Sequence, residues 1–123
     1  MARKADNEEV RPLILHDSES GRDYTLEFNR EIVKYAESRG FSLEDVDRYP
    51  MTKTYELWFY AFRMHHKNVS REKTDKIIDD WGGVAGIPDG VMERLGMLYA
   101  LPFGKLKDED AEDTNPPKVT VEF

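Results

Sequence analysis

Two short apolar stretches near the N-terminus predict a β-hairpin over residues 11–28. Residues 13–15 are apolar, residues 17–21 form a dense cluster of turn-forming side chains, and residues 24–28 alternate apolar with polar positions. Alternate side chains of a strand lie on the same face, so the apolar positions of the second strand should face a core. These positions are Tyr24, Leu26 and Phe28.

A first helix is predicted over residues 30–39. Asn29 is a favourable N-cap residue, and Gly40 accepts the left-handed conformation that commonly ends a helix. Ser42 is then predicted to cap a short helical segment that Pro50 closes. The side chains that the first helix should bury are Ile32, Val33 and Ala36.

Residues 52–66 are the most apolar stretch of the chain and predict a second helix. Well over half of its circumference is apolar or aromatic. Such a helix either runs through the core, as is common in small domains, or presents a second face to another chain. The expected polar stripe consists of Glu56, Tyr60, Arg63 and Lys67. The candidate residues for contact with a client or another subunit are Tyr55, Trp58, Phe59 and Phe62.

Two further helices are predicted, near residues 71–81 and 90–101. Ser70 is the expected N-cap of the first of these, and the pair Gly82-Gly83 should end it. Pro102 marks the end of the second. The single apolar stripe of the 71–81 helix consists of Thr74, Ile77, Ile78 and Trp81.

The C-terminal part of the chain divides into an acidic linker, 105–117, and a strand, 118–123. Five of the six residues 108–113 are acidic, and two prolines follow them. A strand at the end of such a linker needs a sheet to join, which is either its own hairpin or that of a neighbouring molecule. The candidate strand-exchange residues are Val119, Val121 and Phe123.

These elements predict an α+β fold with one globular domain at 11–104. The N-terminal β-hairpin comes first, about four helices follow, and the C-terminal strand lies beyond the acidic linker. Residues 1–10 carry several charges without an apolar run and predict a flexible arm.

Length and composition exclude several classes of protein. A chain of 123 residues suits one modest core. It has no cysteine, so disulfides and cysteine-ligated zinc are excluded. No segment approaches the ~20 apolar residues of a membrane span, and the N-terminus has no apolar signal region. We therefore expect no membrane partner.

The formal net charge of −7 is unevenly distributed and argues against general nucleic-acid binding. The acidic residues of 108–113 account for five of the seven charges and leave −2 for the rest of the chain. Between residues 63 and 76 the chain is locally positive, with five basic residues and two acidic ones. This segment is a solvated surface, a docking patch for an acidic peptide, or a nucleic-acid surface, in decreasing order of expectation. The candidate docking residues are Arg63, Lys67, Arg71 and Lys73.

No pattern in the chain predicts an active site, a metal site or a cofactor. His65 and His66 are adjacent, so on a helix they point about 100° apart and suit a partly exposed helix C-terminus better than a metal. His16 ends a strand without an evident acidic partner. Neither a nucleophile motif nor a phosphate-binding loop is present. We therefore expect a protein that is not an enzyme.

Two stretches of the chain resemble a known family. Residues 26–41 (LEFNREIVKYAESRGF) and 56–66 (ELWFYAFRMHH), with the helix start at 69–74 and the Gly82-Gly83 stop, are similar to small tail assembly chaperones of phages. These phages have long, non-contractile tails and infect Gram-positive bacteria. The resemblance extends from about residue 12 to the end of the chain.

The resemblance implies a non-enzymatic chaperone with two partners. It would coat the tape-measure protein, keep it soluble and recruit tail-tube subunits in the host cell cytoplasm, and it would be absent from the mature virion. The strand at 118–123 offers a head-to-tail contact for a homo-oligomer. The alternative is a structural head-tail or tail completion protein that is retained in the virion. An acidic inhibitor that mimics DNA is less favoured, because the clustered acidic residues are few.

Overall fold

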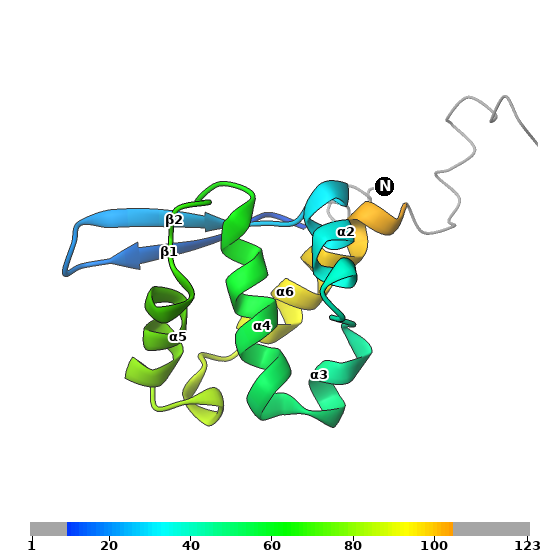
Figure 1. Ribbon diagram of the computed structural model, residues 1–123. Coiled ribbons are helices and arrows are strands. Elements are labelled where there is room, and N and C mark those ends of the chain that lie inside the picture. The colour runs from blue at the N-terminus through cyan, green and yellow to red at the C-terminus, as the bar shows by residue number, and fades with distance from the viewer. Residues whose placement is uncertain (1–9, 105–123) are drawn as a thin grey trace, which may run out of the picture.

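The computed structural model describes residues 10–104 and shows an α+β fold, in which a two-stranded hairpin precedes five α-helices (Figure 1). The strands β1 (Leu13–Asp17) and β2 (Arg22–Leu26) are antiparallel, with Leu13 opposite Leu26. The turn between them projects beyond the helices (Figure 1). Of the predicted arm at 1–10, Val10 is described and packs against the core. Residues 1–9, the acidic linker and the C-terminal strand lie outside the described residues.

The turn of the hairpin is held by the carboxylate of Asp17. Its Oδ1 accepts hydrogen bonds from the backbone N–H groups of Glu19 (3.0 Å) and Ser20 (3.3 Å). Its Oδ2 accepts one from the Ser20 hydroxyl (2.9 Å). Gly21 completes the turn with a φ of +75°, a value that favours glycine. The acidic turn cluster of the sequence therefore has a structural role.

Five α-helices follow the hairpin. The longest is α4, and the fold also contains two short 3₁₀ turns. The helices are α2 (Arg30–Ser38), α3 (Glu44–Arg48), α4 (Pro50–Arg63), α5 (Arg71–Asp80) and α6 (Val91–Ala100). The 3₁₀ turns are η1 (Val84–Gly86) and η2 (Leu101–Phe103).

The ends of α2 confirm their sequence signals. Asn29 Oδ1 accepts a hydrogen bond from the backbone N–H of Ile32 at 2.8 Å, as an N-cap should. At the other end Gly40 has a φ of +88°, and the N–H of Phe41 donates to the carbonyl of Ala36 at 3.0 Å. Together with the Gly40 N–H bond to the Glu37 carbonyl at 2.9 Å, this bond forms a Schellman motif.

The boundaries of α3 and α4 differ from the prediction. The prediction that Ser42 caps α3 is wrong. The N-cap residue is Leu43, and no side chain makes a capping hydrogen bond there. Pro50 is the first residue of α4, where its missing N–H costs nothing, so it starts a helix as well as ending one. The end of α4 at Arg63 comes three residues before the predicted end at residue 66, although the N–H of His66 still donates to the Phe62 carbonyl at 2.8 Å.

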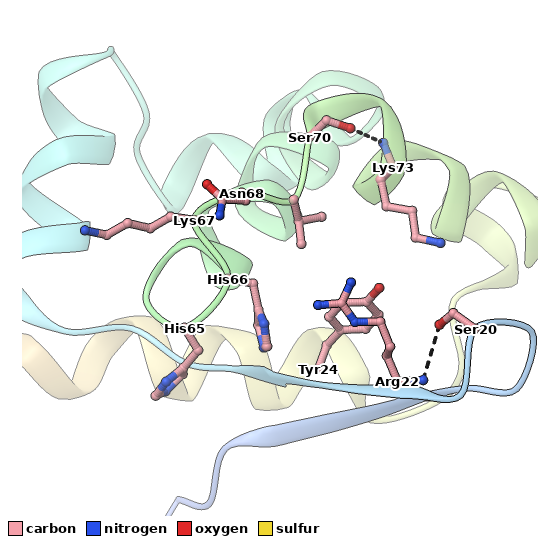
Figure 2. A pocket seen from close by; sticks show the side chains of 10 residues that line it. Ser20, Arg22, Tyr24, His65, His66, Lys67, Asn68, Ser70 and Lys73 are labelled. Carbon is pink, nitrogen blue, oxygen red and sulfur yellow. Dashed lines mark hydrogen bonds between the residues drawn. The ribbon is translucent and has the colours of Figure 1, made fainter.

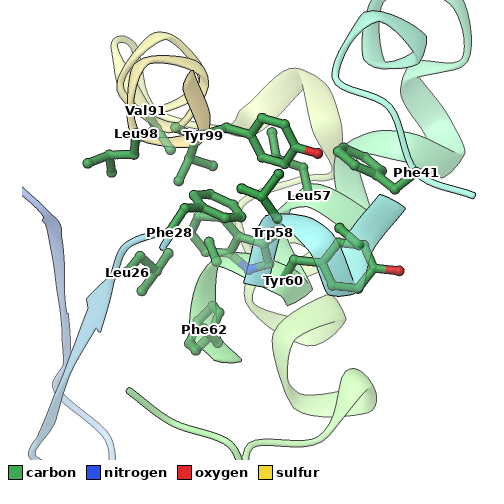
Figure 3. Close-up of a cluster of buried hydrophobic side chains, with 14 of the residues drawn as sticks. Leu26, Phe28, Phe41, Leu57, Trp58, Tyr60, Phe62, Val91, Leu98 and Tyr99 are labelled. Carbon is green, nitrogen blue, oxygen red and sulfur yellow. The ribbon is translucent and has the colours of Figure 1, made fainter. Parts of the chain in front are cut away.

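Helix α4 is the central helix of the fold. It contacts α2, α3, α5 and β2, and Figure 1 shows it standing between α5 and α3. Trp58 and Phe62 are fully buried, and the ring of Trp58 lies edge-to-face with that of Phe62 at 5.5 Å (Figure 3). This face of α4 is therefore core.

One expected polar position of α4 is wrong. Tyr60 is buried rather than part of a polar stripe, because α2 and the following loop cover it. Its ring lies edge-to-face with those of Tyr35 (5.9 Å) and Phe41 (5.6 Å). Burial raises the pKa of the Tyr60 hydroxyl, so this residue stays neutral within the aromatic cluster.

Candidate functional site: exposed apolar side chains and a basic cavity

The four candidate contact residues on α4 lie in two different environments. Trp58 and Phe62 are in the core and could meet a partner only if the core opened. Tyr55 and Phe59 are partly buried and lie at its edge. The hydroxyl of Tyr55 donates a hydrogen bond to Asp79 Oδ1 at 2.6 Å, which links α4 to α5. Only Tyr55 and Phe59 remain candidates for a contact with another chain.

More exposed apolar side chains lie where the sequence patterns did not indicate a surface. Met97, Leu101 and Phe103 belong to α6 and η2, and Phe103 has 64% of its surface exposed. Met97 and Leu101 are four residues apart on continuous helical turns and so share a face. The ring of Phe103 lies 5.9 Å from that of the buried Tyr99. We use the name α6–η2 apolar patch for these three exposed side chains. A second apolar pair, Tyr49 and Met51, is exposed where α4 begins.

The basic segment at 63–76 does not form one patch. The guanidinium of Arg63 lies over the ring of Tyr35 at 4.5 Å from its centroid. Arg71 lies over Phe59 at 5.6 Å and forms an ion pair with Asp75 through Nε at 3.0 Å. The charge of Arg63 is therefore directed towards α2. The charge of Arg71 lies between α4 and an acidic side chain of its own helix, α5.

Lys67 and Lys73 instead line a cavity between the hairpin and the α4–α5 connection (Figure 2). The cavity has a volume of about 500 Å³ and is partly open to solvent. Strand β2 contributes a further cation, Arg22, which lies outside the basic segment at 63–76. We call this site the basic cavity. Its polar lining includes Arg22, His65, His66, Lys67, Ser70 and Lys73.

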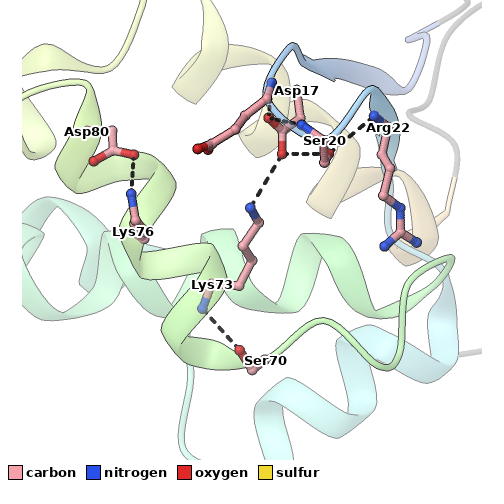
Figure 4. Close-up of polar contacts among 8 residues, drawn as sticks. Asp17, Ser20, Arg22, Ser70, Lys73, Lys76 and Asp80 are labelled. Carbon is pink, nitrogen blue, oxygen red and sulfur yellow. Dashed lines mark hydrogen bonds and ion pairs between the residues drawn. The ribbon is translucent and has the colours of Figure 1, made fainter.

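The three cations of the basic cavity differ in how far they are paired. Lys73 Nζ lies 3.4 Å from Asp17 Oδ2 (Figure 4). Hydrogen bonds from Ser20, with a smaller contribution from Lys73, hold the pKa of the Asp17 carboxyl below its usual value. Arg22 and Lys67 have no acidic partner within residues 10–104. The guanidinium of Arg22 lies 5.7 Å from the ring centroid of Tyr24.

The two adjacent histidines form separate polar contacts with β2 and the residue that follows it. His65 Nε2 lies 2.6 Å from Glu27 Oε1, a partner that is distant in sequence. His66 Nε2 accepts a hydrogen bond from the backbone N–H of Thr25 at 2.9 Å, so Nδ1 carries the proton of the neutral ring. The expectation of a helix C-terminal cation is therefore wrong for His66, which is a neutral acceptor.

The third histidine also has an acidic partner. His16 Nδ1 lies 2.8 Å from Asp23 Oδ1, and the two residues are opposite each other on β1 and β2. The sequence expectation of no acidic partner was wrong, because the hairpin register brings together residues seven positions apart.

The hydrogen bond of His66 predicts a pH-dependent stability. Burial, followed by the nearby charges of His65 and Arg22, lowers the pKa of His66 below its ordinary value of 6.5. Below that pH the unfolded chain binds a proton that the folded chain resists, so stability should fall as the pH falls from 7 towards about 5. We expect His66→Gln, which keeps an acceptor but does not titrate, to show a smaller decrease in urea-unfolding free energy.

The same comparison removes the contribution of the other two histidines, because both proteins retain them. Equal decreases for the two proteins between about pH 7 and about pH 5 would contradict a titrating role for His66.

The described part of the chain offers neither a metal-ligand cluster nor a membrane-spanning helix. Residues 10–104 contain no group of three His, Asp or Glu side chains placed to hold a metal ion. No helix among them is long and apolar enough to cross a membrane. Among the surface features left for a partner are the α6–η2 apolar patch and the basic cavity.

A family model described as a domain of unknown function, DUF5055, matches residues 1–123. The chain belongs to the DUF5055 family. Neither the curated proteins nor the solved structures contain a match to it.

In this DUF5055 protein the two edges of the hairpin differ in what covers them. The outer edge of β2 is occupied, because the N–H of Thr25 bonds to His66 and the N–H of Glu27 donates to the Ala61 carbonyl at 3.1 Å. Within residues 10–104 no strand pairs with the outer edge of β1. If a further strand adds to this sheet, β1 is where it fits.

The candidate strand-exchange residues Val119, Val121 and Phe123 lie outside the described residues, so strand exchange stays a prediction. Deleting residues 118–123 should lower the oligomer mass measured by light scattering, because the added strand would be lost. Replacing both valines with threonine keeps the length and most of the strand propensity, and should lower the mass less. An unchanged mass after deletion would mean that the strand pairs with its own hairpin or has no role in assembly.

Proposed function

We propose that this DUF5055 protein is a phage tail assembly chaperone. It binds and solubilises the tape-measure protein and recruits tail-tube subunits in the host cell cytoplasm, and it does not remain in the mature virion. The family resemblance of residues 26–41 and 56–66 is the source of this proposal. The surface of the folded domain supplies an independent physical argument for it.

The observation that carries the proposal is the α6–η2 apolar patch. Leu101 and Phe103 are large apolar side chains that are 49% and 64% exposed, so they are available to an apolar partner. The patch is part of a rigid helical region, because η2 packs against α6 and α2. A rigid apolar surface suits a helical client whose apolar face must be covered until assembly.

The net negative charge of the chain explains how such an apolar surface can bind a client without the complex precipitating. The net charge of −7 keeps molecules apart in solution, although most of it belongs to residues 108–113 rather than to the described domain. A complex of several such chains on one client would inherit this charge. The proposed chaperone therefore combines a local apolar contact with a net negative charge that lies mainly in one segment.

Co-expression with the tape-measure protein tests the proposal. The wild-type protein should raise the soluble yield of that client several-fold, and the double variant Leu101→Ser with Phe103→Ser should lose most of this effect. The matched control is Tyr49→Ser with Met51→Ser, which removes an equally exposed apolar pair at the start of α4. The control should solubilise the client as the wild type does.

Two results would contradict the proposal. One is an unchanged client yield with the wild-type protein. The other is recovery of the protein in stoichiometric amounts from purified particles, which would favour a structural head-tail or tail completion protein instead.

A further inference from the structure

The basic cavity has the charge and size of a receptor for an acidic peptide. It holds Arg22, Lys67 and Lys73, and only Lys73 has an acidic partner within the described residues. The remaining two cations come from β2 and from the α4–α5 connection, so the fold brings together charges that are distant in sequence. Arg22 and Lys73 are directed towards the cavity, whereas the ammonium of Lys67 is directed away from them (Figure 2). An anion in the cavity would offset the repulsion between the like charges that line it.

The surroundings of the cavity favour a carboxylate-bearing ligand over an apolar one. Ser70 lies in its wall and caps the ten-residue helix α5 by accepting the Lys73 N–H at 3.1 Å. The positive end of the helix dipole therefore adds to the field of the side chains. A volume of about 500 Å³ accommodates several side chains of a peptide rather than a single ion.

The chain itself contains a segment with the complementary charge. Five of the residues 108–113 are acidic, the highest density of negative charge in the sequence. The described chain ends at Gly104, directly after η2. Figure 1 shows η2 beside α2, on the other side of α4 from the hairpin.

Chain length decides between docking within one molecule and docking between two. Asp108 lies four positions beyond Gly104, and four fully extended residues span about 14 Å. A domain of this size is about 30 Å across. The start of the acidic segment therefore cannot span the full width of its own domain. A neighbouring molecule can instead place its cavity next to the segment.

We infer that the acidic segment 108–113 of one molecule docks into the basic cavity of the next. The contact is head-to-tail, because each molecule offers the segment near η2 and receives one beside the hairpin. This inference concerns self-association alone and does not depend on the client. Its test uses only this protein, so it and the chaperone proposal can fail independently.

Sedimentation velocity of full-length variants tests the contact. The cavity variant is Arg22→Glu with Lys67→Glu, neither of which has an acidic partner in the described domain. The segment variant replaces the five acidic residues with their amides, namely Asp108→Asn, Glu109→Gln, Asp110→Asn, Glu112→Gln and Asp113→Asn. We expect each variant alone to self-associate roughly tenfold or more weakly than the wild type.

A mixture of the two variants provides the decisive measurement. The cavity variant still has an intact segment and the segment variant still has an intact cavity, so the mixture should regain a one-to-one complex that neither forms alone. Raising the ionic strength from about 0.05 to about 0.5 M should weaken this complex, since it depends on charges.

The matched control is Lys34→Glu with Arg48→Glu, which makes the same change in net charge at two exposed cations on α2 and α3. This control should associate as the wild type does, and urea unfolding of all variants verifies that each is folded. Three results would overturn the inference: a wild type that stays monomeric at all concentrations, a cavity variant that associates as tightly as the wild type, or a mixture that regains no complex.

Discussion

Replacing Trp58 with alanine should reduce the free energy of unfolding by about 3–5 kcal/mol. Trp58 is fully buried and lies edge-to-face with both Phe62 and Trp81 at 5.5 Å, so its removal leaves a large cavity between α4 and α5. Because small domains have a total stability of about 5–15 kcal/mol, this loss would unfold a substantial fraction of a marginal protein. Urea unfolding monitored by circular dichroism measures the effect.

Two control substitutions separate the core role of Trp58 from a contact role. Trp58→Phe keeps an aromatic ring and removes an indole N–H that has no hydrogen-bond partner among the described residues, so it should cost less than the alanine change. Phe59→Ala removes a partly buried ring at the edge of the core and should cost about 1 kcal/mol. A Trp58→Ala protein with wild-type stability would contradict the placement of this side chain in the core.

The comparison also bears on the proposed function. If α4 contributes to client binding, Phe59→Ala should lower the soluble yield of the tape-measure protein while the fold remains stable. Trp58→Ala should lower it only in proportion to the unfolded fraction. An unchanged yield with Phe59→Ala would instead leave α4 as a folding element and would place the exposed contact on α6 and η2.

Local signals in the sequence predict the helix ends of this protein well. Asn29 and Ser70 cap their helices, and Gly40 ends α2 with the expected left-handed conformation. Each of these signals depends on groups within a few residues of one another, and local backbone chemistry is the same in any fold. The alternation at 24–28 likewise places Tyr24 in the core.

Features that depend on distant residues could not be predicted. The hydrogen bond from the Thr25 N–H to His66 joins residues 41 positions apart, and the burial of Tyr60 depends on Tyr35 and Phe41. The basic cavity shows the same limit, because Arg22 joins the lysines only once the hairpin packs beside the α4–α5 connection. Charge density along the chain indicated a basic segment but not which of its cations would be free.

Gly86→Ala should be the second strongly destabilising change, although it adds only a methyl group. A Cβ atom at this position would lie 1.9 Å from the carbonyl oxygen of Trp81, far inside contact distance. Both atoms belong to the backbone or are attached to it directly, so no side-chain rotation can remove the clash. Removing it requires η1 to move away from the end of α5. Trp81 packs against Trp58, so that movement disturbs the core as well. We expect a loss of about 3 kcal/mol in the free energy of unfolding by urea.

Gly96→Ala is the matched control, because it makes the same chemical change in the interior of α6. A Cβ atom there meets no atom within 4 Å, and alanine favours a helix over glycine by about 1 kcal/mol. The two substitutions should therefore shift stability in opposite directions. Equal effects would show that the approach of Gly86 to Trp81 is not a constraint on the fold. Opposite effects would show that the turn after α5 is fixed by close backbone packing, which holds α5 and its Ser70 cap beside the basic cavity.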